Sequence, residues 1–197
     1  ADAVPPVLVG SVNNCLSIYA FSTENWKRDA KEVSDLMNLL REYLVKLEKD
    51  NQDRNARICV IGDITKLEND LQEKINSIQE KTKNNTGLTL NIAFNYGGRD
   101  EITKAVKKIA SKVANSELNM QDINEQLISD NLYTEGEPDP DLVIRTGGEL
   151  RVSNFLLWQI AYAEFLFVQK YWPDFSEDDL VDAIVTFQNR NRKFGGK

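Results

Sequence analysis

The sequence predicts an α/β fold in which a mainly parallel central sheet is flanked by helices. Short runs rich in β-branched and aromatic residues alternate along the chain with longer segments whose apolar residues recur at helical spacing. The strand-like runs are almost continuously apolar, as in strands that are buried on both faces. Because a helix that joins two parallel strands makes a right-handed crossover, this alternation predicts a sheet covered by helices on both faces.

The expected elements follow one another from residue 16 onward. Strands are expected at residues 16–21, 57–62, 88–95, 141–146 and 164–168. Helical spacing is shown by Val33, Leu36, Met37, Leu40, Tyr43, Leu44 and Leu47, by Leu71, Ile75 and Ile78, by Ile102, Val106, Ile109 and Val113, and by Leu180, Ile184 and Phe187. The run at residues 7–11 can supply one further short strand.

The composition excludes several classes of function. The chain has 197 residues, which fits one domain, and 24 Lys and Arg against 31 Asp and Glu give a formal net charge of -7. A field of that sign opposes nucleic-acid binding, so an anionic ligand must meet a local basic site. The chain contains no histidine, which excludes Ser-His-Asp triads and histidine-ligated zinc. Carboxylates, amides and arginines remain for chemistry.

The sequence indicates a cytoplasmic protein. No basic segment followed by an apolar one opens the chain, as an export signal requires. We expect the two cysteines, Cys15 and Cys59, to be buried free thiols. Residues 155–168 are the most apolar stretch, but Gln159 and Glu164 interrupt it, and it is shorter than the roughly 20 residues of a membrane span.

Polar clusters directly follow three of the expected strands. Residues 22–26 follow the first strand, residues 95–99 the third and residues 146–149 the fourth. In open parallel sheets, ligands bind at the carboxyl ends of the strands. We therefore expect the three clusters to meet at one edge of the sheet and to form the functional site.

The cluster after the fourth strand suits a diphosphate. Arg145 and Arg151 flank the pair Gly147-Gly148, and Ser153 is expected at the start of a helix. Guanidinium groups bind phosphate oxygens in pairs, glycines let backbone N–H groups approach, and a helix N-terminus favours anions. The alternative is a turn in which Arg151 makes a surface ion pair with a nearby carboxylate and Ser153 is a plain N-cap.

The cluster at residues 21–28 can hold a second anion, since it combines hydroxyl, amide, aromatic and cationic side chains. The alternative is that Ser22 or Thr23 caps a helix and Trp26 belongs to the core. Glu164 is the one charge in the apolar run 161–167, which makes it a candidate ligand for Mg²⁺. A structural ion pair between Glu164 and an arginine is the alternative.

Taken together, these segments resemble the cis-prenyltransferases, or isoprenyl transferases, of the undecaprenyl-diphosphate-synthase type. The resemblance covers residues 16–196 through the motifs at residues 19–26, 95–99, 141–149, 153–159 and 172–175. Several long motifs in the right order are more specific than any one of them. The resemblance implies condensation of isopentenyl diphosphate with an allylic diphosphate, such as farnesyl diphosphate, with Mg²⁺ as cofactor and a polyprenyl diphosphate as product.

The resemblance also implies roles for individual residues. Asn25 is the family's proposed proton acceptor, although a neutral amide is a poor base and positions substrate better than it takes a proton. The substrate site is lined by Phe21, Ser22, Thr23, Glu24, Trp26 and Arg28, and isopentenyl diphosphate is bound by Arg145, Arg151, Val152 and Ser153. Glu164 is the metal residue.

Further features of the family extend the prediction. The helix over residues 33–47 resembles the one that walls the family's hydrophobic tunnel, although any core helix shows similar apolar residues. Residues 192–195 resemble the Arg-x-Gly tail that reaches across the family's homodimer, with Lys193 replacing an arginine. We thus expect a homodimer, and a lipid product implies peripheral contact with membranes, although no amphipathic anchor is visible.

The family's first catalytic motif is absent from the sequence. Family members begin with a strand that ends in Met-Asp-Gly-Asn-Gly-Arg-Trp, whose aspartate binds Mg²⁺. Residues 1–15 hold nothing similar, since Asp2 precedes the run at 7–11 instead of following it. We therefore divide the chain into an atypical N-terminal segment, residues 1–15, and a cis-prenyltransferase domain, residues 16–197, and assign no aspartate to the allylic site.

Two explanations of this departure stay open. Either the sequence lacks a segment that the whole protein has, or the chain is a non-catalytic subunit that binds isopentenyl diphosphate or a partner without turnover. The retained Asn25 and Glu164 favour the first. A nucleotide-binding domain is a third reading, but no Gly-x-Gly-x-x-Gly or Walker loop is present to support it.

Overall fold

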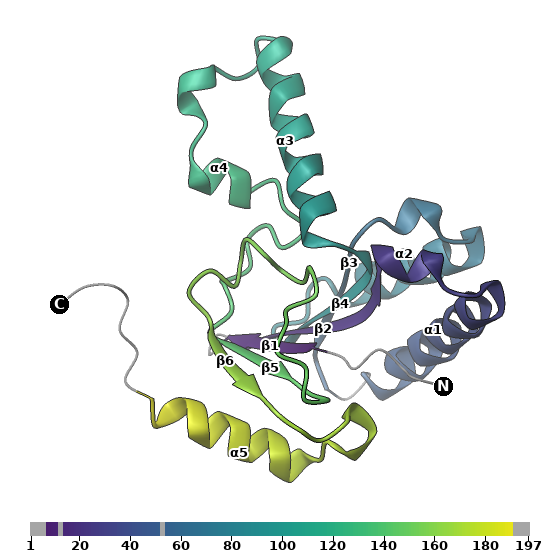
Figure 1. Cartoon of the computed structure of the whole chain (residues 1–197). Coiled ribbons are helices and arrows are strands. Elements are labelled where there is room, and N and C mark those ends of the chain that lie inside the picture. The colour runs from purple at the N-terminus through teal and green to yellow at the C-terminus, as the bar shows by residue number, and fades with distance from the viewer. Residues whose placement is uncertain (1–6, 12–13, 52–53, 191–197) are drawn as a thin grey trace.

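The computed structural model describes residues 7–11, 14–51 and 54–190. Its centre is a six-stranded sheet of order β3-β4-β2-β1-β5-β6 (Figure 1). The strands are β1 (Val7–Ser11), β2 (Cys15–Ser22), β3 (Arg57–Ile61), β4 (Thr89–Tyr96), β5 (Leu142–Arg145) and β6 (Glu164–Phe167). All five strands expected from the sequence are confirmed, as is the short strand at residues 7–11. Asp2 and the tail at residues 192–195 lie outside the described residues.

The sheet is parallel except for β1. The pairs β2–β4, β3–β4 and β5–β6 are parallel, whereas β1 is antiparallel to both of its neighbours, β2 and β5. These two antiparallel steps bring β5 into the direction of β2, so five strands share one direction. The mainly parallel sheet is therefore confirmed, and the carboxyl ends of these strands lie along one side of the sheet, here called the carboxyl edge.

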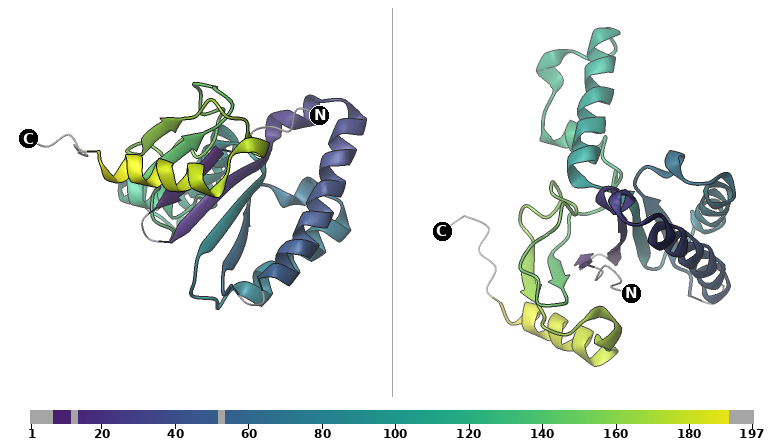
Figure 2. Two further views of the ribbon diagram at one scale, coloured as in Figure 1. Left: turned by 90° about the horizontal axis from the view of Figure 1, so that it is seen from below. Right: turned by 45° about the vertical axis from the view of Figure 1, so that its right-hand side comes forward.

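The described residues form five α-helices. They are α1 (Ala30–Asp50), α2 (Asn69–Thr82), α3 (Gly98–Ala114), α4 (Glu125–Ser129) and α5 (Glu177–Gln188). The four longer helices coincide with the segments of helical spacing. Figure 1 shows α3 extending away from the sheet with α4 beside it, and Figure 2 shows α1 and α5 over different halves of the sheet. Within the described chain, no helix is both long and apolar enough to cross a membrane.

The two faces of the sheet are covered by different elements. Ile92 of β4 packs with Leu40 of α1 and Ile75 of α2 in one cluster of the core. The next residue of β4, Ala93, points to the opposite face, where Phe155 and Leu156 cover it. On the other half of the sheet, α5 covers β5. The two faces of the sheet are thus covered by different parts of the chain.

The helix expected to begin at Ser153 is not formed. Residues 153–162 make a series of turns, and Ser153, Asn154 and Leu156 have positive φ angles of 51°, 64° and 44°. Such angles lie in the left-handed region, which cannot propagate a right-handed helix. The prediction that a helix N-terminus helps to bind an anion at Ser153 is therefore wrong.

Candidate active site

The polar clusters after β2 and β4 meet at the carboxyl edge. The indole N–H of Trp26 donates to Asn95 Oδ1 at 2.7 Å, and the Asn95 amide donates to the carbonyl of Asp63 at 2.6 Å. Trp26 lies in the short helix after β2, Asn95 is near the end of β4, and Asp63 lies just beyond the end of β3. Asn95 is almost fully buried and has a φ of 49°, a conformation that asparagine tolerates better than most residues. One buried amide thus connects three strand ends.

The segment after β5 reaches the same edge through Asn154. The side-chain amide of Asn154 donates to Glu24 Oε1 at 3.0 Å, and its Oδ1 accepts the backbone N–H of Arg99 at 2.9 Å. Its carbonyl accepts the N–H of Gly98 at 2.7 Å. The predicted meeting of residues 22–26 with residues 95–99 is therefore confirmed. The segment after β5 joins them through Asn154, which lies beyond the predicted cluster at residues 146–149.

The residues after β2 form a short 3-10 helix, Thr23–Lys27, with Ser22 as its N-cap. Asn25 is buried, and its Oδ1 accepts the backbone N–H of Ser22 at 2.7 Å. The alternative that Ser22 caps a helix is thus confirmed. Trp26 is 38% exposed, so it does not belong to the core and can meet a ligand.

The other predicted residues of this cluster differ in exposure. Phe21 is buried and stacks on Phe94, so it supports the site from inside. The hydroxyl of Thr23 donates to Glu24 Oε2 at 3.1 Å. Arg28 is half-buried and forms an ion pair with Glu32 one turn further along the chain. Among the residues of this cluster that were predicted to bind substrate, Glu24 and Trp26 are the exposed ones.

The two arginines after β5 form a local basic site. Arg145 is only 4% exposed, and burial lowers the pKa of its guanidinium, as does the positive charge of Arg151 to a smaller extent. Arg151 is largely exposed and forms an ion pair with Glu149. The ion pair expected in the alternative reading is thus confirmed, but it leaves two cations close enough to repel each other. A bound anion would relieve that repulsion.

The two glycines do not direct their N–H groups at a ligand. Gly147 and Gly148 have φ angles of 79° and 71°, which require glycine. Their N–H groups donate to the carbonyls of Lys170 at 2.8 Å and Val168 at 3.0 Å. The prediction that these N–H groups approach a phosphate is therefore wrong in this arrangement. Their role is to hold the loop against the segment that follows β6.

The neighbours of these glycines complete the loop. Val152 is half-buried and Ser153 is exposed, so the Ser153 hydroxyl is free to reach a ligand. Thr146 is fully buried, and its hydroxyl has no hydrogen-bond partner among the described residues. Thr146 could not be singled out from the sequence, because nothing around it distinguishes it from an ordinary threonine at the end of a strand.

An apolar groove, here called the α1 groove, lies between α1 and the sheet. Its volume is about 320 Å³, and its lining is Ile18, Tyr19, Ala20, Leu36, Leu39, Leu40, Tyr43, Ile92, Phe94 and Trp172. Such a size and an apolar lining are typical of sites for small apolar ligands. The groove lies under the N-terminal half of α1, which starts three residues after the 3-10 helix at the carboxyl edge. Part of α1 is therefore a groove wall and part is core.

Glu164 lies away from the basic site. It is the first residue of β6 and pairs with Leu142, whereas Arg145 pairs with Phe167 at the other end of the strand. Its carboxylate forms an ion pair with Arg190 at 2.9 Å, and both side chains are about one-third exposed. The structure therefore contains the ion pair of the alternative reading. Over residues 7–11, 14–51 and 54–190, no group of three or more Asp, Glu or Cys side chains is arranged to hold a metal ion.

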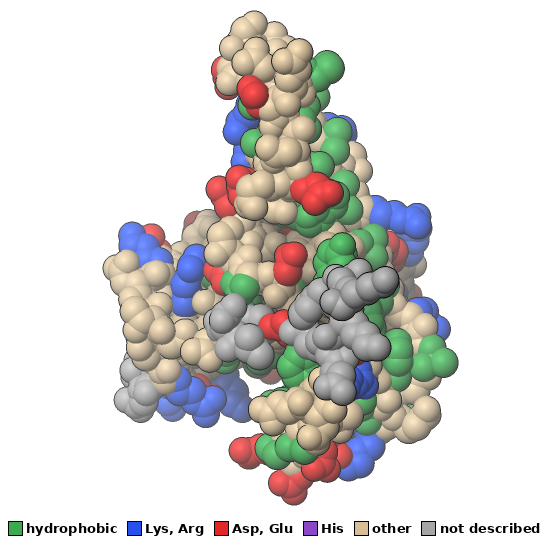
Figure 3. Space-filling model, turned by 90° about the vertical axis from the view of Figure 1, so that its left-hand side faces the viewer, with side chains coloured by type: hydrophobic (Ala, Val, Ile, Leu, Met, Phe, Trp, Pro, Cys, Tyr) green, Lys and Arg blue, Asp and Glu red, His purple; other side chains and the backbone are tan. Residues whose placement is uncertain are grey.

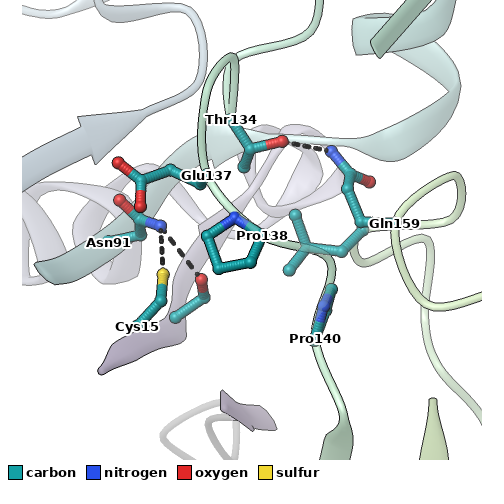
Figure 4. A pocket seen from close by; sticks show the side chains of 9 residues that line it. Cys15, Asn91, Thr134, Glu137, Pro138, Pro140 and Gln159 are labelled. Carbon is teal, nitrogen blue, oxygen red and sulfur yellow. Dashed lines mark hydrogen bonds between the residues drawn. The ribbon is translucent and has the colours of Figure 1, made fainter. Parts of the chain in front are cut away.

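A second, much smaller pocket lies near the amino end of β2 (Figure 4). Its cavity of about 10 Å³ is near the minimum for one water molecule. Asn91 donates to Cys15 Sγ and to Ser17 Oγ, each at 3.3 Å. Burial raises the pKa of Cys15 to about 12, so this thiol stays neutral and unreactive. Cys15 and Cys59 are both free, as predicted, although Cys59 is only partly buried.

Comparisons with known proteins agree with this arrangement. The sequence model of the family described as putative undecaprenyl diphosphate synthase matches residues 11–195. The isoprenyl transferase of Clostridium tetani is 50% identical over 181 residues, which are 92% of this chain and 71% of that protein. The isoprenyl transferase of Brucella suis is 49% identical over the same shares of both chains.

Two solved structures share the fold. Lavandulyl diphosphate synthase from Lavandula x intermedia, in complex with dimethylallyl diphosphate, superposes with a TM-score of 0.90 at 37% identity, over 93% of this chain and 79% of that one. A probable undecaprenyl diphosphate synthase from Campylobacter jejuni superposes with a TM-score of 0.82 at 38% identity, over 93% and 84%. With its motifs in the family's order and converging at one edge of the family's fold, the chain belongs to the undecaprenyl diphosphate synthase family of prenyltransferases.

Proposed function

We propose that the chain elongates prenyl chains in the cis configuration, condensing isopentenyl diphosphate with an allylic diphosphate such as farnesyl diphosphate. The observation that carries this proposal is that the chain holds both a basic site after β5 and an apolar groove along α1. Tyr19 of β2 is part of the groove lining, its side chain packs with Phe155 on the other face of the sheet, and it interacts electrostatically with Arg145. A substrate with a diphosphate head and an apolar tail needs sites of these two kinds.

Isopentenyl diphosphate is assigned to Arg145, Arg151, Val152 and Ser153. Arg145 is held in the protein, so it offers a fixed cation, whereas the exposed Arg151 must exchange Glu149 for a phosphate. An anion between the two guanidinium groups replaces their repulsion by two attractions. The exposed hydroxyl of Ser153 adds a donor from the same loop.

The reaction joins the terminal carbon of isopentenyl diphosphate to the first carbon of the allylic substrate. The allylic carbon–oxygen bond breaks, diphosphate leaves with the electron pair, and isopentenyl diphosphate then loses a proton to form the new double bond. Asn25 is assigned to positioning, because its Oδ1 already accepts the Ser22 N–H and a neutral amide is a poor base. The departing diphosphate is the base assigned to the proton.

The residues of the second cluster and of the α1 groove are assigned to the allylic substrate. Glu24 and Trp26 lie on the 3-10 helix that precedes α1 and Arg28 follows it, with Phe21, Ser22 and Thr23 in the same segment. The exposed apolar side chains of Leu39 and Tyr43 offer a lining for the growing prenyl chain. Burial of each added isoprene unit in an apolar groove is favourable, which assists elongation.

Magnesium is part of the proposal, with Glu164 as its candidate ligand. Mg²⁺ is usually held by one or two carboxylates together with substrate phosphates, and it stabilises the charge on the leaving diphosphate. In the described residues, however, Glu164 pairs with Arg190 and lies at the end of β6 opposite the Arg145 end. These residues do not fit a metal shared with a diphosphate on Arg145, and no step is assigned to the ion.

A homodimer in the cytoplasm, in peripheral contact with the membrane that takes its lipid product, completes the proposal. Support for the dimer comes from exposed apolar residues on neighbouring elements, Phe167 of β6 and Val181, Ile184 and Val185 of α5. The same helix carries Glu177, Asp178, Asp179 and Asp182, and Figure 3 shows carboxylates gathered at that end of the molecule. Light scattering on the purified chain would give its mass.

Calorimetric titration with isopentenyl diphosphate tests the binding half of the proposal. The wild-type chain should bind, and Arg145→Ala should lose binding, since it removes the fixed cation. Arg190→Ala is a matched control, because it removes an arginine outside the basic site. Equal affinities of Arg145→Ala and the wild type would contradict the site assignment.

A further inference from the structure

Asn154 connects the loop after β5 to two other parts of the carboxyl edge. Its side-chain N–H reaches Glu24 at 3.0 Å, its Oδ1 accepts the Arg99 N–H at 2.9 Å and its carbonyl accepts the Gly98 N–H at 2.7 Å. These three contacts are called the Asn154 junction. Asn154 keeps a φ of 64°, which asparagine tolerates better than most residues.

The chemistry of its partners fixes the orientation of the Asn154 amide. Glu24 is a carboxylate that only accepts, and the Arg99 N–H only donates. A rotated amide would place an oxygen against a carboxylate and an N–H against an N–H. A Cβ at Gly97 would lie 2.6 Å from the Thr23 hydroxyl and 2.9 Å from the Asn154 amide, so only glycine leaves room for this arrangement. The junction is therefore tightly packed and has a single hydrogen-bonding pattern.

We propose that Asn154 is a positioning residue for prenyl transfer, which sets the loop of Arg151 and Ser153 in register with the loop of Asn25. The inference rests on the proposed function. Ser153 precedes Asn154 in the chain, and Glu24 precedes Asn25. One hydrogen bond thus spans the two loops that carry the two substrates. Because reaction between two bound substrates depends steeply on their relative placement, this bond acts on the rate.

Glu24 is ionised in the junction. Burial by itself raises the pKa of its carboxyl, but hydrogen bonds from its own backbone, from Asn154, from Thr23 and from Ser22 outweigh it, so the pKa lies below its usual range. Tyr19 of β2 is the titratable side chain that interacts with Glu24, and burial raises its pKa, so it stays neutral. Arg99 and Arg151 are charged residues next to the junction on the two segments that Asn154 joins to the Glu24 loop.

Asn154→Asp probes the junction selectively. The variant keeps an oxygen for the Arg99 N–H but places a carboxylate against Glu24. Two carboxylates at this separation cannot both be ionised cheaply, so one of them takes up a proton as the pH falls. The shared proton restores a hydrogen bond between residues 154 and 24. Asn154→Gly keeps the left-handed backbone but loses both side-chain bonds at every pH.

Asn115→Asp is a matched control. Asn115 also donates its side-chain amide to a glutamate, Glu117, at 3.2 Å, but it caps the far end of α3. The substitution creates a similar pair of carboxylates at an exposed position away from the carboxyl edge. It should leave kcat and KM unchanged.

The test measures kcat and the KM for isopentenyl diphosphate from pH 5.5 to 8.5, relative to the wild type. We expect Asn154→Asp to lower kcat by about 10- to 100-fold at high pH and to change KM by less than about 3-fold. Its kcat should recover as the pH is lowered. Asn154→Gly should lose kcat at every pH. A wild-type kcat for Asn154→Asp at pH 8.5, or a loss that acid does not reverse, would overturn the proposal.

Hydrogen exchange separates this inference from the proposed function. The amide of Arg99 should exchange faster in Asn154→Gly and stay protected in Asn154→Asp, whether or not the chain turns over. Unchanged protection of the Arg99 amide in Asn154→Gly would overturn the claim that the Asn154 side chain holds the two segments together. A wild-type chain without prenyl transfer would instead count against the proposed function.

Discussion

Trp26 and Asn95, 69 residues apart in the sequence, are joined by a hydrogen bond of 2.7 Å from the indole N–H to the amide oxygen. Since Asn95 is almost fully buried, loss of the indole leaves its oxygen without a donor. Trp26 is also 38% exposed and is one of the residues assigned to the proposed allylic site. The same bond therefore contributes to stability and fixes the orientation of an exposed aromatic side chain.

Trp26→Phe should destabilise the chain by about 1–3 kcal/mol, because it leaves a buried acceptor unsatisfied. Urea unfolding followed by circular dichroism measures the change. Trp172→Phe is the control, since the Trp172 indole N–H makes no hydrogen bond among the described residues and its ring stacks on Phe175. Equal losses in the two variants would show that only aromatic area matters.

The pair Asp63–Lys104 should make stability depend on acid pH. The hydrogen bond from Lys104, followed by that from Thr65, lowers the pKa of Asp63 from 3.8 to about 2. A carboxyl group whose pKa is lowered by folding stabilises the protein above its unfolded pKa, and this stability is lost as the pH falls towards 2. Asp63→Asn should cost about 1–2 kcal/mol at pH 7, allowing for the exposure of Lys104, and clearly less at pH 2.

Asp35→Asn, on the exposed side of α1, is the control for Asp63→Asn. It should change stability by less than about 0.5 kcal/mol at both pH values. The Asp63 carbonyl that accepts from Asn95 is retained in Asp63→Asn, so the measurement isolates the side chain. A constant difference in stability between pH 7 and pH 2 would contradict the role given to the ion pair.

Leu39 should influence product length without affecting the fold. It is 60% exposed yet lines the α1 groove, so Leu39→Trp fills the groove and should shorten the products. The free energy of unfolding should change by less than about 0.5 kcal/mol. Val45→Trp, at a 51% exposed position of α1 outside the groove lining, should leave product length unchanged. Thin-layer separation of labelled products makes the comparison, and identical products from all three chains would exclude the groove as the chain-binding site.

Glu164→Gln distinguishes a metal ligand from a structural ion pair. If Glu164 binds Mg²⁺, as the family resemblance implies, the Mg²⁺ concentration for half-maximal turnover should rise at least about 10-fold, in line with the loss of a ligand. If its partner is only Arg190, the variant should lose at most about 1 kcal/mol of stability, because both side chains are one-third exposed. In that case its Mg²⁺ dependence should match that of Arg190→Ala.

The strands and their convergence could be predicted because they depend on backbone pattern and topology. The apolar runs at β2, β4 and β5 identify buried strands, and a parallel sheet brings their carboxyl ends to one edge. The meeting of residues 22–26 with residues 95–99 needed no knowledge of side-chain contacts. The roles of Asn154 and Asp63, by contrast, could not be predicted from the sequence, because they arise from side-chain contacts between distant segments.

The errors of prediction have local causes. The run after Ser153 is apolar enough for a helix, but positive φ angles at three residues break it into turns, and no glycine in the sequence marks them. Helical spacing in α1 could not separate groove from core. Leu40 and Leu44 face the core, while Leu39 and Tyr43, four residues apart, form an exposed part of the groove wall.

Incorporation of labelled isopentenyl diphosphate into butanol-extractable product, with farnesyl diphosphate and Mg²⁺, shows whether the chain elongates a prenyl primer. We predict products longer than the primer, at wild-type levels with Asn115→Asp and at strongly reduced levels with Arg145→Ala. A no-metal sample measures the part played by Mg²⁺. Binding of isopentenyl diphosphate by the wild-type chain without any product would contradict the assignment of this chain as an elongating prenyltransferase.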